Sequence, residues 1–387
     1  MKNDVLRIAI ISPLFESVPP KFYGGTERVV SWLTEELVAL GHDVTLFASG
    51  DSVTNARLRA PVPRALRLEG CRDEVAPHLA MLDDVFESAD EFDVIHFNMD
   101  HWHLLVCKHL RLPGVTTLHG RLDNPEIVPL YKRVRESPLV SISDAQRQPL
   151  PFVNWVGTVY HGLPRDLLPY TERHGSYAAF LGRISPEKGT DRAIRIARRA
   201  GIPLKIAAKV DKADQAYYEE RIRPLLQEPG VEFVGEIGEN EKARFLGGAL
   251  ALLFPIDWPE PFGIVMIEAM ACGTPIIAYR CGSVPEVMRD GETGFIVDDE
   301  DAAVAALHKL DQIERAACRR AFEERYTARR MALDYLRVYR RVCQPAMLRT
   351  AAWKAANEVT DAIALYPPRL TPAEGATMAK PLTKPAH

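Results

Sequence analysis

The feature that most constrains the fold is a regular alternation of short apolar runs with amphipathic segments of helical period. The apolar run at 6–12 is followed by a helical pattern at 25–41 and a second run at 42–49. Later runs fit further strands of the same sheet, at 93–97, 115–119, 139–143 and 157–162. This alternation is typical of parallel sheets that helices cover on both faces.

The same pattern restarts in the second half of the chain, after a turn-rich segment. Strands are expected there at 177–182, 203–209, 231–235, 251–256, 275–280 and 294–298. The sequence therefore predicts two doubly wound α/β domains with the site in the cleft between them, because ligands bind beyond the carboxyl ends of such strands. The expected boundaries are 1–165 for the first domain, 166–176 for a linker, 177–326 for the second domain, 327–345 for a helix that crosses back, and 346–387 for an extension that is largely disordered from about 366.

Composition narrows the class of protein. The net charge of −4 over 387 residues gives no argument for nucleic acid as a partner. Apolar runs stay short of the roughly 18 residues that span a membrane, and the N-terminus reads as a first strand rather than a signal peptide. The six cysteines are scattered without zinc spacing, which is typical of reduced thiols and predicts a cytoplasmic location.

The segment PEPFGIVMIEAMACGTPII places Glu260 in a loop after a predicted strand and Glu268 inside the apolar helix that follows. A carboxylate among apolar residues needs a partner, and the hydroxyls of a sugar or ribose would serve. Taken singly, Glu260 would more often complement a helix dipole, and Glu268 would more often lie on a solvated face.

Three other motifs follow strands that enter the predicted cleft. Gly24 and Gly25 precede the first helix, where paired glycines allow close approach to a phosphate, although such a pair often marks a plain turn. Arg183 and Lys188 bracket a turn after the first strand of the second domain, where surface basic residues are commonly just solvated. His119 ends the strand at 115–119, and a lone histidine is usually structural.

Residues 259–297, PEPFGIVMIEAMACGTPIIAYRCGSVPEVMRDGETGFIV, resemble the signature of the retaining glycosyltransferases of family 4, which have the GT-B fold of two Rossmann-like domains. The resemblance implies that Glu260 contacts the donor sugar and Glu268 the nucleotide ribose. It implies that Arg183 and Lys188 neutralise the donor phosphates and that His119 approaches the sugar. Further donor contacts are expected from Gly24, Gly25, Ile237, Phe262, Gly263 and Ile264.

The first domain is expected to bind the acceptor, with Asp100, His101 and Trp102 lining that side. Although the segment HFNMDHWH is rich in histidine, it lacks a recognised ligand set, so no metal is predicted, and Arg183 and Lys188 would supply the positive charge instead. The arginine-rich segment 56–72 is interpreted as a solvated loop. The alternatives are docking on an acidic acceptor or on anionic lipid, the latter a peripheral contact at the inner membrane face.

The sequence thus predicts a retaining, metal-independent hexosyltransferase that uses a UDP- or GDP-sugar and needs no other cofactor. The acceptor, a glycan, a lipid-linked sugar or a small molecule, stays open. Two alternatives remain: a GT-B sugar-nucleotide epimerase, which needs no acceptor, and a nucleotide-sugar-binding protein without turnover. A phosphorylase would need a lysine that carries pyridoxal phosphate, and none can be located in the sequence.

Overall fold

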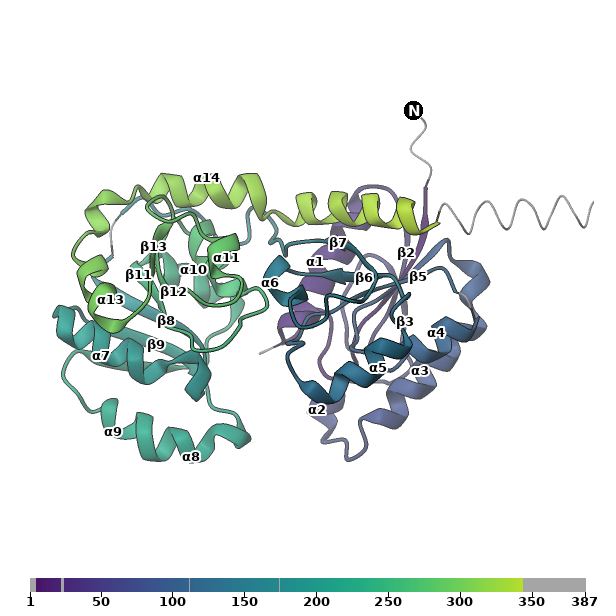
Figure 1. Ribbon diagram of the computed structural model, residues 1–387, viewed down its shortest axis with the longest axis horizontal. Helices are drawn as coiled ribbons and strands as arrows, with labels where there is room; N and C mark the ends of the chain where they lie inside the picture. The colour runs from purple at the N-terminus through teal and green to yellow at the C-terminus, as the bar shows by residue number, and fades with distance from the viewer. Residues whose placement is uncertain (1–4, 22–23, 111, 174, 344–387) are drawn as a thin grey trace, which may run out of the picture. The chain divides into compact units, whose positions relative to one another are not determined.

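The computed structural model describes residues 5–21, 24–110, 112–173 and 175–343. They form two parallel sheets, one in each half of the chain (Figure 1). The first sheet has the strand order β3-β2-β1-β4-β5-β6-β7, and the second has the order β10-β9-β8-β11-β12-β13. The predicted pair of doubly wound α/β domains is confirmed.

The strands of the first sheet are β1 (Arg7–Ile11), β2 (Asp43–Phe47), β3 (Arg57–Arg59), β4 (Val94–Phe97), β5 (Gly114–Thr117), β6 (Leu139–Ser141) and β7 (Trp155–Thr158). Those of the second sheet are β8 (Tyr177–Arg183), β9 (Leu204–Lys209), β10 (Val231–Gly235), β11 (Ala249–Phe254), β12 (Ile276–Tyr279) and β13 (Gly294–Val297). The central strands are buried on both faces, because every side chain of β4 and β5 is buried and four of the five in β1 are buried. This explains their unbroken apolar runs.

The helices of the first half are α1 (Gly25–Ala39), α2 (Leu66–Glu69), α3 (Val75–Glu87), α4 (Leu104–Leu110), α5 (Val128–Arg133) and α6 (Asp144–Arg147). Those of the second half are α7 (Thr190–Ala200), α8 (Gln215–Tyr217), α9 (Arg223–Leu225), α10 (Glu239–Gly247), α11 (Ile264–Ala271), α12 (Val284–Val287), α13 (Glu300–Leu307) and α14 (Arg315–Arg325). A further helix covers residues 328–343. Short 3₁₀ or π turns lie at Ala89–Glu91, Pro125–Ile127, Pro186–Lys188, Lys212–Asp214, Tyr218–Ile222 and Leu310–Gln312.

The strand order reverses beside the first strand of each sheet. β1 pairs with β2 on one side and β4 on the other, and β8 pairs with β9 and β11. A crevice forms beyond the carboxyl ends of the strands at such a switch point. The loops that follow β1, β4, β8 and β11 are therefore the ones that the fold gathers around a ligand.

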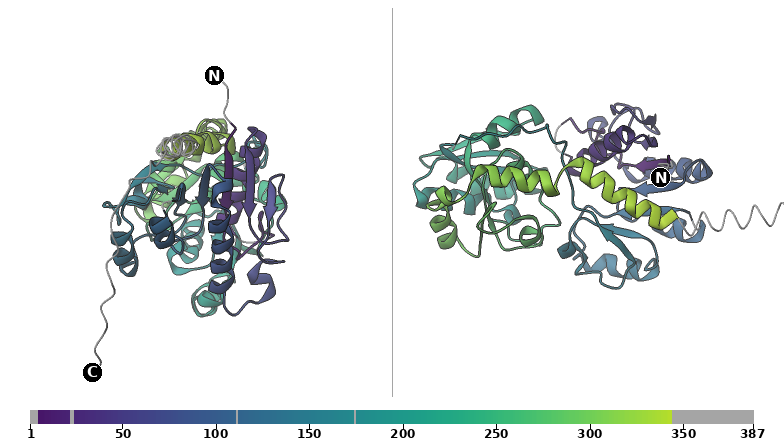
Figure 2. Two further views of the ribbon diagram at one scale, coloured as in Figure 1. Left: turned by 90° about the vertical axis from the view of Figure 1, so that its right-hand side faces the viewer. Right: turned by 90° about the horizontal axis from the view of Figure 1, so that it is seen from above.

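The helix at 328–343 packs against the first sheet (Figures 1 and 2). The buried Tyr339 hydroxyl lies 2.8 Å from Nδ1 of His96 in β4, and the Tyr335 hydroxyl lies 2.9 Å from Oγ1 of Thr117 in β5. These bonds join residues more than 200 positions apart in the sequence. The extension predicted for 346–387 lies outside the described residues.

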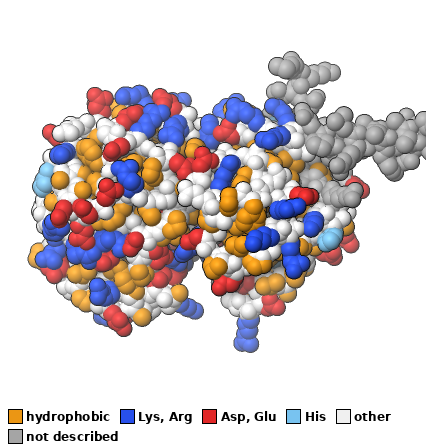
Figure 3. Space-filling model, viewed as in Figure 1, with side chains coloured by type: hydrophobic (Ala, Val, Ile, Leu, Met, Phe, Trp, Pro, Cys, Tyr) orange, Lys and Arg blue, Asp and Glu red, His pale blue; other side chains and the backbone are white. Residues whose placement is uncertain are grey.

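The segment 56–72 is not the plain loop that the sequence suggested. It contains the edge strand β3 and the short helix α2, and the Arg59 guanidinium lies 5.5 Å from the ring centre of Phe47. Two arginines in a three-residue strand conceal its β pattern, although charged side chains are common on sheet edges. Basic and acidic side chains are interspersed on the molecular face that Figure 3 shows. Within the described ranges, no helix is long and apolar enough to span a membrane.

Candidate active site

A pocket of about 500 Å³ is lined by residues from the carboxyl-end loops of both sheets. The predicted site residues that line it are Gly24, Gly25, Asp100, Trp102, His119, Arg183, Lys188, Ile237, Glu260, Phe262, Gly263, Ile264 and Glu268. Of the predicted set, His101 alone is not among the lining residues, and its ring lies edge-on to Tyr131 with centroids 6.4 Å apart. Sequence reasoning placed His101 on the acceptor side because of its neighbours, but its side chain packs toward α5 instead.

The loop between β11 and α11 is held by the segment that follows β12. The Ser283 hydroxyl donates to the carbonyl of Phe262 at 2.9 Å, and the Ser283 amide donates to the carbonyl of Glu260 at 3.0 Å. A Cβ atom on Gly282 would lie 2.3 Å from the backbone nitrogen of Glu260, so only glycine permits this approach. Gly263 caps α11 in the left-handed region with φ of 76°. The loop geometry therefore depends on residues about twenty positions further along the chain.

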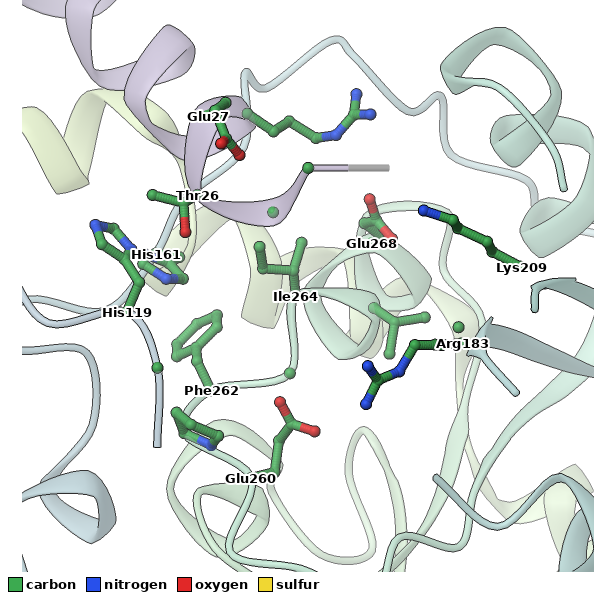
Figure 4. A pocket seen from close by; sticks show the side chains of 18 of the residues that line it. Thr26, Glu27, His119, His161, Arg183, Lys209, Glu260, Phe262, Ile264 and Glu268 are labelled. Atoms are coloured by element: carbon green, nitrogen blue, oxygen red, sulfur yellow. The ribbon is translucent and has the colours of Figure 1, made fainter. Parts of the chain in front are cut away.

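Glu260 is buried and held by a cation and an indole. Nζ of Lys188 forms a short ion pair with Oε2 of Glu260, and Nε1 of Trp258 donates to the same oxygen at 3.0 Å. The Lys188 ammonium also lies 4.6 Å from the ring centre of Trp258. These contacts satisfy a carboxylate that would otherwise be costly to bury, and they aim it into the pocket (Figure 4).

Glu268 lies in the second turn of α11 and is 3% exposed. Nζ of Lys242 in α10 lies 2.5 Å from its Oε1 atom. Nearby, Arg28 of α1 forms an ion pair with Glu239 at the start of α10. Burial lowers the pKa of Arg28, while the charges of Glu268 and Glu27 oppose that shift. The helix N-termini of α1, α10 and α11 thus contribute charged groups to one end of the pocket.

Arg183 lies at the end of β8 among three carboxylates. Its guanidinium is 2.6 Å from Glu187, 3.5 Å from Asp211 and 3.6 Å from Asp214. Its side chain is about one-third exposed and lines the pocket. The acidic partners offset its charge, so a phosphate would have to compete with them for the guanidinium.

His119 stacks on a second histidine that the sequence analysis did not single out. Its ring centre lies 5.4 Å from that of His161, with the planes 14° apart, and Figure 4 shows the two rings side by side. Nε2 of His119 lies 3.0 Å from the side-chain oxygen of Asn98, while the buried Nδ1 atoms of both histidines have no hydrogen-bond partner among the described residues. Burial lowers the pKa of His119 to about 4, so it is neutral at pH 7.

The glycine pair meets α11 across the pocket. A Cβ atom on Gly24 would lie 2.8 Å from Cβ of Pro20, and one on Gly25 would lie 3.8 Å from Cδ1 of Ile264. A side chain at position 24 would therefore clash with Pro20, whereas a Cβ atom at position 25 would make only an ordinary contact with Ile264. Two helix N-termini thus face the same space, which is an arrangement that favours an anion.

Besides His101, the segment HFNMDHWH holds His96 and His103, and both of these are structural. His96 lies 2.7 Å from Oγ1 of Thr117 as well as bonding Tyr339, and Nε2 of His103 lies 2.7 Å from Oγ1 of Thr116. Within residues 5–21, 24–110, 112–173 and 175–343, no group of three His, Cys, Asp or Glu side chains is placed to hold a metal ion.

These buried histidines predict a loss of stability in mild acid. Burial lowers the pKa of His96 and of His103 to about 3. Below about pH 6.5 each of these histidines takes up a proton in the unfolded chain but stays neutral in the folded chain. Acid therefore favours unfolding. We expect the free energy of unfolding to fall by about 1.4 kcal/mol per pH unit for each histidine, between about pH 6.5 and about pH 3.

Urea denaturation at pH 7, 6 and 5 measures this loss. The variant His103→Gln should show a shallower pH dependence than the wild type, while His109→Gln, at an exposed position of α4, serves as the matched control. Equal stability at pH 7 and pH 5 in the wild type would show that these imidazoles are not held neutral.

Several pocket residues escaped the sequence analysis. Lys242 and Lys209 line the pocket and lie in segments that were interpreted only as a loop or a strand, and His161 was interpreted as the end of a strand. Trp258 is not among the lining residues but bonds the lining residue Glu260. Trp258 could have been found, because it stands beside Glu260 in the same loop. The others come together only through folding, because His161 follows β7 whereas His119 follows β5.

Family models match both halves of the chain. Residues 172–326 match "Glycosyl transferases group 1", and residues 23–151 match "Glycosyltransferase Family 4". Phosphatidyl-myo-inositol mannosyltransferase from Mycolicibacterium smegmatis is 26% identical over 375 residues, covering 87% of this chain and 94% of that protein. Glycogen synthase from Mycobacterium tuberculosis is 26% identical over 373 residues, covering 82% of this chain and 89% of that protein.

Solved structures share the fold. The glycosyltransferase AviGT4 of avilamycin A biosynthesis has a TM-score of 0.67 and 24% identity, covering 87% of this chain and 98% of its own. Anabaena HepE, solved with UDP and glucose, has a TM-score of 0.65 and 18% identity, covering 86% of this chain and 98% of its own. Matches over both domains, together with the shared two-sheet architecture, show that this chain belongs to the family 4 glycosyltransferases, hexosyl-transferring enzymes of GT-B fold.

Proposed function

We propose that the enzyme transfers a hexose from a nucleoside-diphosphate sugar to an acceptor hydroxyl with retention of anomeric configuration and without a metal ion. The observation that carries this proposal is the convergence of Glu260, Glu268, Lys188 and His119 on one pocket between two facing helix N-termini. HepE, which has a similar fold, was solved with UDP and glucose, and this supports a nucleotide-sugar donor of the same class.

In this proposal the donor lies along the N-terminus of α11. Glu268 accepts hydrogen bonds from the ribose hydroxyls, and its ion pair with Lys242 holds the carboxylate in place. Glu260 accepts hydrogen bonds from hydroxyls of the transferred sugar. The pyrophosphate lies between the two carboxylates, where the backbone amides of Gly263 and Ile264 face it.

The reaction breaks the bond between the anomeric carbon and the pyrophosphate oxygen, so negative charge grows on the leaving group. Lys188 and Arg183 supply the compensating positive charge. The acceptor hydroxyl attacks from the same face, and its proton passes to an oxygen of the departing phosphate. Neutral His119 would bind a sugar hydroxyl through its unpartnered Nδ1 atom.

Donor turnover without an acceptor tests the proposal. The purified protein is incubated with UDP-, GDP- and ADP-hexoses in EDTA, and NMR follows release of the nucleoside diphosphate. Slow hydrolysis of one donor is the expected result, since water can replace the acceptor. If no donor binds, the proposed function is wrong.

The same spectra separate the two alternatives. An epimerase would convert the sugar nucleotide into its epimer and release no nucleoside diphosphate. A binding protein without turnover would broaden the donor resonances but leave the donor intact, even when sugar acceptors are added.

A further inference from the structure

The end of the pocket that the first sheet forms has its own chemical character. Its lining includes Phe15, Glu27, Arg67, His78, Asp100 and Trp102. Phe15 lies against the ring of His78 at 4.8 Å and that of Trp102 at 6.4 Å, and His78 and Trp102 are 4.7 Å apart. Three rings in mutual contact form an apolar wall with polar groups beside it, as small-molecule sites commonly have. We call this region the acceptor end.

Glu27 is the most unusual polar group of the acceptor end. It lies in the first turn of α1 and is 4% exposed, and within the described parts of the chain no cation forms an ion pair with it. Because Gly24 has no Cβ atom, the carboxyl can fold back toward the loop, within 3.1 Å of where that atom would stand. Glu27 is thus a carboxyl at the pocket wall, held by backbone hydrogen bonds at Glu27 and Glu16 rather than by an ion pair.

Burial also changes what this carboxyl can offer a ligand. Desolvation raises the pKa of Glu27 to about 7, although backbone hydrogen bonds and the charge of Arg67 oppose the shift; the charge of Glu16 adds to it. Near neutral pH the group therefore has both a protonated form, which donates a hydrogen bond, and an ionised form, which accepts two. Hydroxyl groups, which both donate and accept, match either form.

The charges around Glu27 disfavour an anionic ligand. Arg67 is already paired with Glu16 at 3.4 Å and lies over the ring of Phe15. His78 carries no compensating charge, because its Nε2 atom accepts from the amide of Leu14 at 2.9 Å and burial lowers its pKa. Asp100 adds a further carboxylate at the pocket wall. A phosphate at this end would face Glu27 and Asp100, and the guanidiniums of Arg67 and Arg28 already engage Glu16 and Glu239.

We propose that the acceptor end binds an uncharged polyol, such as a sugar or cyclitol ring that carries no phosphate, through a hydrogen bond from one of its hydroxyls to Glu27 and contact of its apolar face with Trp102. This inference rests on the proposed function and adds the chemical class of the acceptor. It makes Glu27 a residue that determines acceptor specificity and does not touch the donor.

The test uses the full chain, the donor that turns over, and matched pairs of acceptors. The pairs are methyl α-D-glucoside with glucose 6-phosphate, and myo-inositol with inositol 1-phosphate. We expect kcat/KM for the neutral member to exceed that for its phosphorylated partner by about 10-fold or more, the factor that one poorly placed charge or unmade hydrogen bond produces. Preference for the phosphorylated members, or no transfer to either, would overturn the inference.

Glu27→Gln then tests the residue itself. At about pH 8.5, above the pKa of Glu27, it should lower kcat/KM for the neutral acceptor by about 10- to 100-fold, because it removes the charged acceptor of the hydrogen bond, with donor hydrolysis in the absence of acceptor changed less than about 2-fold. Glu36→Gln, on the same helix but away from the pocket lining, is the matched control. Unchanged transfer by Glu27→Gln would also contradict the inference.

Donor hydrolysis distinguishes a failure of the proposed function from a failure of the proposed acceptor class. If wild-type protein hydrolyses no donor and binds none, the proposed function fails, and the acceptor class fails with it. If donor hydrolysis is intact but the acceptor preference or the Glu27→Gln effect is absent, only this inference is wrong.

Discussion

Replacing Glu260 with alanine should reduce sugar transfer by roughly 10³-fold or more while leaving nucleotide affinity within a few-fold of the wild type. Two physical effects combine. The donor sugar loses the carboxylate that fixes its orientation, and Lys188 at the pocket wall loses the partner that positions it. The nucleoside contacts, which centre on Glu268 and Lys242, remain. Initial rates of donor hydrolysis and calorimetric titration with the nucleoside diphosphate measure the two quantities separately.

Asp257→Ala is the matched control for this experiment. Asp257 lies three positions earlier in the same loop, but its side chain is 81% exposed and it does not line the pocket. Its replacement should leave transfer nearly unchanged. Full activity in Glu260→Ala would remove Glu260 from the site, and a large loss of nucleotide binding would show that the variant damages the loop as a whole.

Replacing Lys188 with methionine should lower turnover by about 10²- to 10³-fold, with a smaller loss of donor affinity. The ammonium lies beside Glu260 and over Trp258, so it is fixed in place before the donor binds. Charge on the leaving diphosphate grows as the glycosidic bond breaks, and a fixed cation therefore stabilises the transition state more than the ground state. Methionine keeps the length of the side chain and its contact with Trp258 but removes the charge.

The measurement is kcat for donor hydrolysis, together with the affinity for the intact donor. Lys212→Met, at an exposed position outside the pocket lining, controls for the loss of one positive charge. If Lys188→Met weakens donor binding and leaves kcat unchanged, the lysine contributes to binding alone and the leaving-group role is incorrect.

The order of elements could be predicted from the sequence because central strands of parallel sheets are continuous apolar runs. The strand before His119, predicted at 115–119, lies within two residues of β5 at both ends. Glu260 and Glu268 could be identified because the continuous segment 259–297 that carries them resembles the family 4 signature. The edge strand β3 could not, since its arginines mask the β pattern.

Contacts between distant segments could not be predicted, because the residues that form them are brought together only by folding. Arg183 pairs with Asp211 and Asp214, which come from the segment after β9. Nothing in the sequence near these aspartates indicates that pairing. The same holds for Arg315, which is buried and donates to the carbonyls of Ala249 and Gly247 at 2.9 and 3.0 Å. The burial of Glu27 depends on a glycine three positions earlier, and a glutamate in a first helical turn otherwise reads as an ordinary partner of the helix dipole.

The anomeric configuration of the first product shows whether the enzyme transfers a hexose from a nucleotide sugar with retention. Proton NMR spectra recorded within the first turnovers of an α-linked nucleotide sugar show the freed or transferred sugar before it can mutarotate. If the enzyme retains the configuration, the α-anomer appears first. A β-anomer as the first product would contradict retention, since the acceptor would then attack from the opposite face of the sugar.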